Sequence, residues 1–235
     1  MKKLILTSIV ALLPIVGNAG VLAITKDSGQ ISESVKSGSG TDINPTRFYI
    51  SIKGGNNSLS GTFGGDSDNV DSGIDFDGAS TGVFTGSIGF DLGTPRVRWE
   101  FELSKVSAGD IEFAEPYTDL LHGNIGYTSY MINFIPYFRI NNTSSVLLTL
   151  GLGGASVDFT DTDDADAFNL KSSGGFAVNL GLGLDIKLSD HFSIIPEFKY
   201  NGIIASTTYK NMYVTGTDNL YISNFQALLG MRLTF

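Results

Sequence analysis

The last fifteen residues, Tyr221 to Phe235, alternate between two kinds of side chain, and this alternation restricts the fold more than any other feature. One set of alternate positions is apolar apart from one Ser and includes Phe225, Leu229, Met231, Leu233 and Phe235. The positions between them are mostly polar or small and include one Arg. A period of two predicts a β-strand whose faces meet different surroundings. The stretch is also longer than the roughly five or six residues usual in globular strands.

The same alternation recurs in earlier segments and gives eight predicted strands, at about 46–55, 82–92, 96–106, 124–140, 146–157, 175–188, 192–203 and 221–235. Short turns and long polar connections alternate between these strands, as is typical of outer-membrane barrels. Because lipid cannot satisfy an open sheet edge, such a sheet must close. We therefore predict an all-β fold, an up-and-down, eight-stranded antiparallel transmembrane β-barrel with short periplasmic turns and long extracellular loops. A secreted soluble β-domain is the alternative interpretation.

The N-terminus has the organisation of a secretory signal peptide. Two lysines precede an apolar core, Leu4 to Val16, which is shorter than the roughly 20 residues of a membrane-spanning helix. Small residues at 17 and 19 predict cleavage after Ala19. The predicted organisation is therefore a signal peptide at 1–19, a flexible Ser/Gly-rich periplasmic lead-in at 20–44 and a barrel at 45–235.

Composition excludes several classes of protein. The formal net charge is −9, and nucleic-acid binding would need clustered Lys and Arg, so we expect no nucleic-acid partner. The chain has no Cys, so no disulfide holds the fold together. The expected surroundings are the lipid of the bacterial outer membrane and, during insertion, the outer-membrane assembly machinery.

The predicted extracellular loops are strongly acidic. They contain Asp75, Asp77, Glu112 and Asp158 among many other carboxylates, against a single Lys. The candidate partners of such a surface are host surface molecules and divalent cations. Solvated loops kept soluble by their charge are the alternative. The run from Asp161 to Asp166 lacks the sixth-position Gly and the distal Glu of an EF-hand, so we expect no specific metal or cofactor site.

The inward faces of the predicted strands carry charges that need partners or water. These candidate lumen residues are Lys53, Arg98, Glu100, Glu102, Asp185, Lys187, Glu197 and Lys199. One interpretation is an ion-pair network that plugs the barrel, because eight strands leave room mainly for side chains. The other is a hydrated pore for small hydrophilic solutes, since small inward residues such as Gly151 and Gly181 leave space.

Catalysis is not expected. The two histidines, His122 and His191, fall at opposite ends of the predicted barrel and cannot share a site. A site built from His122, Asp119 and a Ser is the remaining arrangement for nucleophilic chemistry.

Three stretches resemble the major surface antigens of Anaplasma, Ehrlichia and related obligate intracellular bacteria. They are the segment 84–103 with its G-x-P-R-V-x-x-E-x-E hairpin at Gly93 to Glu102, the N-P-x-R-F-Y-I-S segment at Asn44 to Ser51, and the final Phe235. The resemblance covers about Asn44 to Phe235 and departs at Trp99 and in the loops. It implies an eight-stranded barrel related to opacity and OmpA-type proteins, exposed on the cell surface as an antigen or adhesin, with some family members regarded as porins. The alternate apolar residues Phe225, Leu229, Met231, Leu233 and Phe235 also resemble the C-terminal insertion signature of bacterial outer-membrane barrels. The resemblance implies no catalytic residues.

Overall fold

The computed structural model describes residues 46–64, 74–78, 80–93, 96–113, 122–160, 169–170, 173–210 and 215–235. The predicted signal peptide, the cleavage position after Ala19 and the predicted lead-in lie outside these residues, as do parts of the predicted loops. Every regular element in the described ranges is a β-strand. No helix in the described part of the chain has the length and apolar character needed to cross a membrane.

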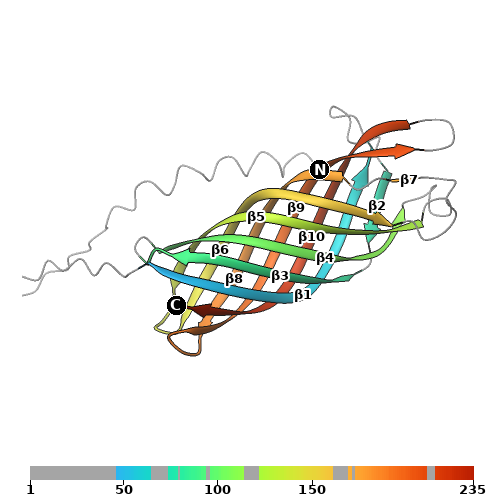
Figure 1. Ribbon diagram of the computed structural model, residues 1–235. Coiled ribbons are helices and arrows are strands. Elements are labelled where there is room, and N and C mark those ends of the chain that lie inside the picture. Colours follow the sequence, from blue (N-terminus) through green and yellow to red (C-terminus); the bar gives the residue numbers. More distant parts are fainter. Residues whose placement is uncertain are drawn as a thin grey trace, which may run out of the picture. The chain divides into compact units, whose positions relative to one another are not determined.

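Ten strands follow one another along the chain (Figure 1). They are β1 (Arg47–Phe63), β2 (Ile74–Gly78), β3 (Thr81–Asp91), β4 (Val97–Phe113), β5 (His122–Arg139), β6 (Ser144–Thr160), β7 (Asn169–Leu170), β8 (Ser173–Lys187), β9 (Phe192–Lys210) and β10 (Thr215–Thr234). Both β2 and β3 lie between β1 and β4, and both β7 and β8 pair with β9. The ten elements therefore fill eight positions, because β2 shares its position with β3 and β7 shares its position with β8; both short strands lie in segments predicted as loops.

The sheet closes on itself. Strand β1 pairs antiparallel with β10 from Tyr49↔Thr234 to Phe63↔Leu220, and β10 pairs in turn with β9. Each of the other long strands pairs antiparallel with its neighbours along the chain. The predicted all-β, up-and-down, eight-stranded barrel is thus confirmed.

The three short turns lie where the sequence predicts them. The amide of Leu92 donates to Val97 O over 3.0 Å, that of Ile140 to Ser144 O over 2.9 Å, and that of Leu188 to Phe192 O over 2.9 Å. Gly93 has a φ of 67°, which a residue with a side chain rarely adopts. We call this end of the barrel the turn end, and the opposite end the loop end. The C-terminus lies at the turn end (Figure 1).

The strands extend well beyond the predicted bounds at the loop end. Strand β1 continues to Phe63 rather than residue 55, and β4 to Phe113 rather than 106. Acidic residues predicted in loops, such as Asp77, Glu112 and Asp158, therefore lie on strands. A register shift between Val106 and Gly109 lets β4 continue past polar residues that break its alternation.

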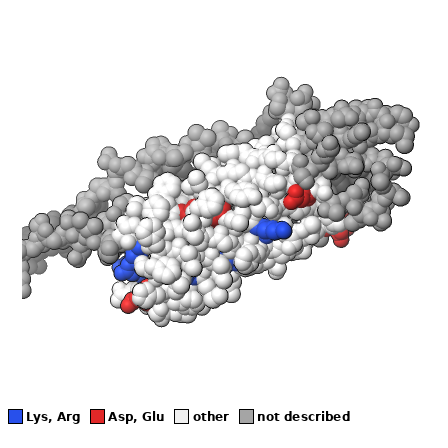
Figure 2. Space-filling view, in the orientation of Figure 1, with Lys and Arg blue, Asp and Glu red and all other residues white. Residues whose placement is uncertain are grey.

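The outer wall is apolar where a soluble domain would be polar. Phe84 is 61% exposed, Leu182 58% and Phe225 69%, and their neighbours on the same face are similar. On the face drawn in Figure 2, most of the wall carries no Lys, Arg, Asp or Glu. Soluble proteins rarely expose apolar patches beyond a few hundred Å². The wall thus favours a barrel surrounded by lipid over a soluble β-domain.

A charge in the middle of this wall should be costly. We expect Leu182→Arg, on the outer face of β8, to reduce the free energy of unfolding by about 2–4 kcal/mol in lipid vesicles. The matched control is Ser206→Arg, on exposed wall near the loop end of β9, which should change it by less than about 1 kcal/mol. Equal losses in urea titrations of the two variants would contradict this placement of the lipid-facing band.

Candidate functional site

The lumen is the candidate functional site, because it gathers most of the buried charge. Every second residue of the long strands points inward, so each strand contributes a column of side chains to the lumen. Along these columns the side chains change in character from the turn end to the loop end. Near the turn end they are charged groups beside a small apolar cluster of Ile135, Tyr137, Leu147 and Ile195; amides follow, and mostly apolar groups fill the last part.

The central charge cluster consists of Lys53, Glu100, Glu102, Glu197 and Lys199, each at most 5% exposed. Lys53 Nζ lies 2.7 Å from Glu197 Oε2 and 3.6 Å from a carboxylate oxygen of both Glu100 and Glu102. Lys199 Nζ donates to both oxygens of Glu102, over 2.8 and 2.7 Å. These contacts join β1, β4 and β9 across the lumen.

Neutral donors complete the central charge cluster, which has three carboxylates and two ammonium groups. Thr149 Oγ1 donates to Glu197 Oε1 over 2.8 Å. Asn133 Nδ2 lies 3.3 Å from Glu102 Oε2 and 3.5 Å from Glu100 Oε1. Hydrogen bonds of this kind lower the cost of burying the excess carboxylate.

The turn-end charge cluster consists of Asp91, Arg98, Asp185 and Arg232. Arg98 Nε lies 2.9 Å from Asp91 Oδ2, and its Nη2 lies 2.7 Å from Asp185 Oδ2. Arg232 Nη2 also donates to Asp185 Oδ2. The guanidinium of Arg98 stacks 4.5 Å above the centre of the Tyr137 ring, which adds a cation–π contact. The cluster carries no formal net charge and joins β3, β4, β8 and β10.

The sequence did not identify every member of these clusters. Arg232 was recognised as polar but not as a lumen charge, although it shares the inward parity of Gln226 on β10. Asp91 has the inward parity of Ser87 and was missed in the same way. Lys187 was predicted in the network, but it is half-buried at the end of β8 and has no ion-pair partner among the described residues. Strand parity was the signal available for the two missed residues.

A layer of amides follows the charges toward the loop end. Asn201 Nδ2 donates to Asn224 Oδ1 over 3.0 Å, and Gln226 Nε2 donates to Tyr127 OH over 3.0 Å. Asn57 is 1% exposed, and neither of its side-chain polar atoms has a partner among the described residues. Buried polar groups of this kind are ordinarily met by ordered water.

The apolar plug fills the loop-end part of the lumen. Its buried members are Leu59, Phe63, Phe76, Val83, Val106, Ile111, Ile125, Tyr127, Met131, Ala155, Val157, Ala177, Ile203, Ala205, Leu220, Ile222 and Leu228. They come from all eight positions of the barrel, and most are below 5% exposed. The plug therefore packs as a core within the described part of the barrel, where the buried Ser173 lies opposite its member Val157.

Two lumen glycines make room for neighbouring polar side chains. A Cβ added at Gly151 would clash with the side-chain oxygens of Asn133 and Asn179, and one at Gly181 would lie 2.8 Å from Glu197 Oε1. The space that was expected to favour a pore is thus occupied by neighbouring polar side chains.

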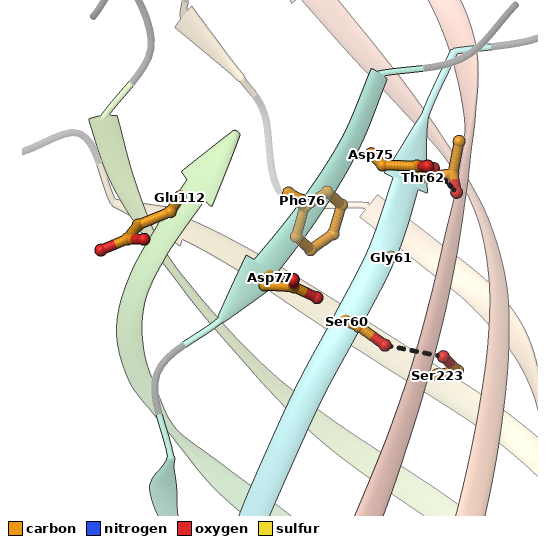
Figure 3. Close-up of a pocket in the computed structure, with 8 residues that line it drawn as sticks. All are labelled: Ser60, Gly61, Thr62, Asp75, Phe76, Asp77, Glu112 and Ser223. Carbon is orange, nitrogen blue, oxygen red and sulfur yellow. Dashed lines mark hydrogen bonds between the residues drawn. The ribbon is translucent and has the colours of Figure 1, made fainter. Parts of the chain in front are cut away.

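The loop end carries an acidic pocket on β1, β2, β4 and β10 (Figure 3). Its volume is about 420 Å³, and its lining includes Asp75, Asp77 and Glu112. Thr62 Oγ1 donates to Asp75 Oδ1 over 2.7 Å, while the Asp77 and Glu112 side chains are exposed to solvent. Within the described ranges, no group of His, Asp or Glu is arranged to hold a metal ion.

The remaining predicted residues lie on the wall and at the ends. Phe225, Leu229, Met231, Leu233 and Phe235 all lie on the outer face at the C-terminal end of the chain and are 40–69% exposed. His191 lies in the turn between β8 and β9, where its Nδ1 is 2.9 Å from Thr234 O. His122 begins β5 at the other end, and Asp119 lies outside the described residues.

Comparison with known proteins gives one family and several similar folds. The sequence model of the family "Outer membrane protein beta-barrel domain" matches residues 34–232. The outer-membrane protein AlkL, solved in lipid bilayers, is similar with a TM-score of 0.56 and 14% identity, over 89% of this chain and 97% of that one. Neisserial surface protein A is 15% identical, with a TM-score of 0.49 and coverage of 80% and 97%. OprG from Pseudomonas aeruginosa is 16% identical, with a TM-score of 0.48 and coverage of 80% and 95%. No curated protein matches the chain.

Breaking the central charge cluster should destabilise the fold. We expect Lys199→Met to reduce the free energy of unfolding by about 3–5 kcal/mol, because it leaves Glu102 buried without its nearest cation. The double variant Lys199→Met with Glu102→Leu should recover most of this loss, since it removes both charges. Lys105→Met, an exposed lysine on β4, is the control. A loss below about 1 kcal/mol for Lys199→Met in denaturant titrations would contradict the assignment.

Proposed function

Because the chain belongs to the outer membrane protein β-barrel domain family, we propose that it is a closed surface barrel, of the antigen or adhesin type, that presents an acidic rim to basic partners. Its location is the bacterial outer membrane, with the short turns in the periplasm and the loop end at the cell surface. The observation that carries the proposal is the filled lumen. The charge clusters block the turn end, and the apolar plug blocks the loop end.

The acidic rim supports the binding part of the proposal. The described charges exposed at the loop end include Asp75, Asp77, Asp110, Glu112 and Asp158. Such a field attracts cationic partners and accelerates their association, most strongly at low ionic strength. Three of these carboxylates line the pocket in Figure 3, and their negative charge suits a Lys or Arg side chain of a host molecule.

A small porin is the second candidate, and the amide layer is what favours it. The unpartnered atoms of Asn57, with Nδ2 of Asn224 and Oε1 of Gln226, are consistent with water inside the barrel. Water in this layer would have to pass both the apolar plug and the charge clusters to form a continuous path. The closed barrel is therefore the better-supported function.

Conductance separates the two candidates. We expect the refolded mature chain to give no steady single channels in planar bilayers, because an apolar plug excludes hydrated ions. Its folded state is checked by a change in gel migration on boiling. Steady channels that change size in Lys53→Met or Glu100→Gln would overturn the closed barrel in favour of the porin.

Binding to a cationic probe tests the acidic rim. We expect the triple variant Asp75→Asn, Asp77→Asn, Glu112→Gln to weaken binding of a lysine-rich peptide about tenfold at low salt, as three exposed ion pairs would allow. The difference should shrink at high salt because exposed charges are screened. Asp190→Asn, at the turn end, is the matched control and should bind as the unchanged protein does. An unaltered affinity in the triple variant would refute this role for the pocket.

A further inference from the structure

A set of cations at the turn end takes no part in the two charge clusters. Its members are Arg47 at the start of β1, Arg96 just before β4, Arg139 at the end of β5 and Lys187 at the end of β8. Each has the inward parity of its strand, so the set borders the mouth of the lumen and not the lipid-facing wall. None of them forms an ion pair with a described residue. We call this set the basic rim.

Backbone pairing places three members of the basic rim on one side of the mouth. An amide of β5 donates to Arg96 O over 3.1 Å, so Arg96 lies beside that strand. Arg139 is opposite Ser145 of β6, and the amide of Lys187 donates to Thr143 O, just before β6, over 2.8 Å. Because neighbouring strands lie about 4.8 Å apart, Arg139 and Lys187 flank β6 at a backbone spacing on the order of 10 Å.

The charges around Lys187 are mostly of its own sign. Arg139, Arg232 and Arg98 repel its ammonium group. Asp185 attracts it, but this carboxylate already accepts hydrogen bonds from both arginines of the turn-end charge cluster. Lys187 is half-buried, so solvent screens the repulsion less than it would on an open surface. An anion bound at this place would relieve the repulsion.

The other carboxylates of the turn end do not balance the basic rim. Asp91 is bound by Arg98 and by the hydroxyl of Tyr137. Asp190 is exposed in the turn between β8 and β9. The terminal carboxylate belongs to Phe235, whose side chain lies on the outer wall. The mouth of the lumen therefore keeps an excess of positive charge.

One buried donor beneath the basic rim also lacks an acceptor. Arg232 is 4% exposed, and its Nη2 donates to Asp185 and Ser193. Its Nε has no partner among the described residues. Because buried donors are almost always paired, we expect an acceptor from outside the described chain here, either water or an anionic group.

We propose that the basic rim docks an acidic segment of a soluble periplasmic protein. Its cations lie on or beside β1, β4, β5 and β8, a spread too wide for one small anion, whereas a peptide can present several carboxylates. Guanidinium groups pair with carboxylates through two parallel hydrogen bonds. The charge clusters close the lumen behind the rim, so the segment rests on the mouth without entering it. The periplasmic location of the partner rests on the proposed function, which places the short turns in the periplasm.

Binding of a glutamate-rich peptide tests the proposal. The mature chain is placed in phosphatidylcholine nanodiscs, which leave both ends of the barrel accessible, and binding of the labelled peptide is followed by fluorescence anisotropy. We expect saturable binding that weakens as salt is added, because exposed charges are screened. The triple variant Arg96→Gln, Arg139→Gln, Lys187→Gln should bind about tenfold more weakly, as the loss of three ion pairs allows. A change in gel migration on boiling checks that each variant is folded.

Matched variants separate docking at the rim from general attraction. Lys105→Gln, an exposed lysine on β4 away from the turn end, is the control and should bind as the unchanged protein does. Equal affinity in the Gln triple variant would overturn the proposal. Displacement of the peptide by inorganic phosphate at the same concentration of charge would also overturn it, since a single small anion would then suffice.

The two ends of the barrel are tested independently. The triple variant of the loop-end pocket, which should lose binding of the lysine-rich peptide, should bind the glutamate-rich peptide at least as tightly as the unchanged protein. A loss of glutamate-rich peptide binding in that variant would place the site at the wrong end and overturn the basic rim. Failure of the lysine-rich peptide alone would count against the acidic rim and leave this inference intact.

Discussion

The pairing of the first long strand with the last is the interaction on which the rest of the structure depends. Strands β1 and β10 pair along fifteen residues of β1, from Tyr49 to Phe63. Without that ladder both strands would present unpaired amides and carbonyls to lipid, where each unsatisfied group costs several kcal/mol. Once the sheet is closed, one set of alternate residues on each strand faces the lipid and the other set faces the lumen. The apolar wall and the polar interior are two consequences of the same ring.

Closure also creates an electrostatic problem that the two charge clusters solve. Eight strands leave an interior wide enough for side chains and little else, so inward Lys, Arg, Asp and Glu lose most of their contact with water. Glu102, at 1% exposed, is tolerable because Lys199 donates to both of its oxygens, and Lys53 and Asn133 lie beside it. The same networks that make the charges tolerable also fill the lumen, and the apolar plug completes the closure. A closed interior leaves the rim and the outer wall as the surfaces available to partners.

Sequence alone predicted the ring, the three short turns and most of the inward charges, because all of these follow from a period of two. The bounds at the loop end were wrong because alternation weakens there. In β4 the bulge after Val106 puts Ser107 and Ala108 out of phase, which made a continuing strand look like a loop. The apolar plug was not predicted, because inward residues such as Ile203 and Ile222 broke the expected rule of polar inside and apolar outside. Parity places Arg232 in the lumen, but only the tertiary structure shows that it shares Asp185 with Arg98.

The charge clusters have a second effect, which concerns strand register. A slip of one residue would turn every apolar side chain of β10 into the lumen, so alternation alone forbids it. A slip of two residues preserves the alternation and moves each side chain by roughly 6.6 Å, so the alternation cannot prevent such a slip. The charged groups in the lumen can prevent it. Gly230 is opposite Lys53, and a Cβ there would clash with the lysine stem, so a slip that places Leu228 or Arg232 opposite Lys53 would crowd the lumen at this point. The same slip would carry Arg232 away from Asp185 and leave a buried charge less well paired. We infer that the ion pairs contribute more to selecting one register than to net stability, since buried pairs often add little over apolar packing.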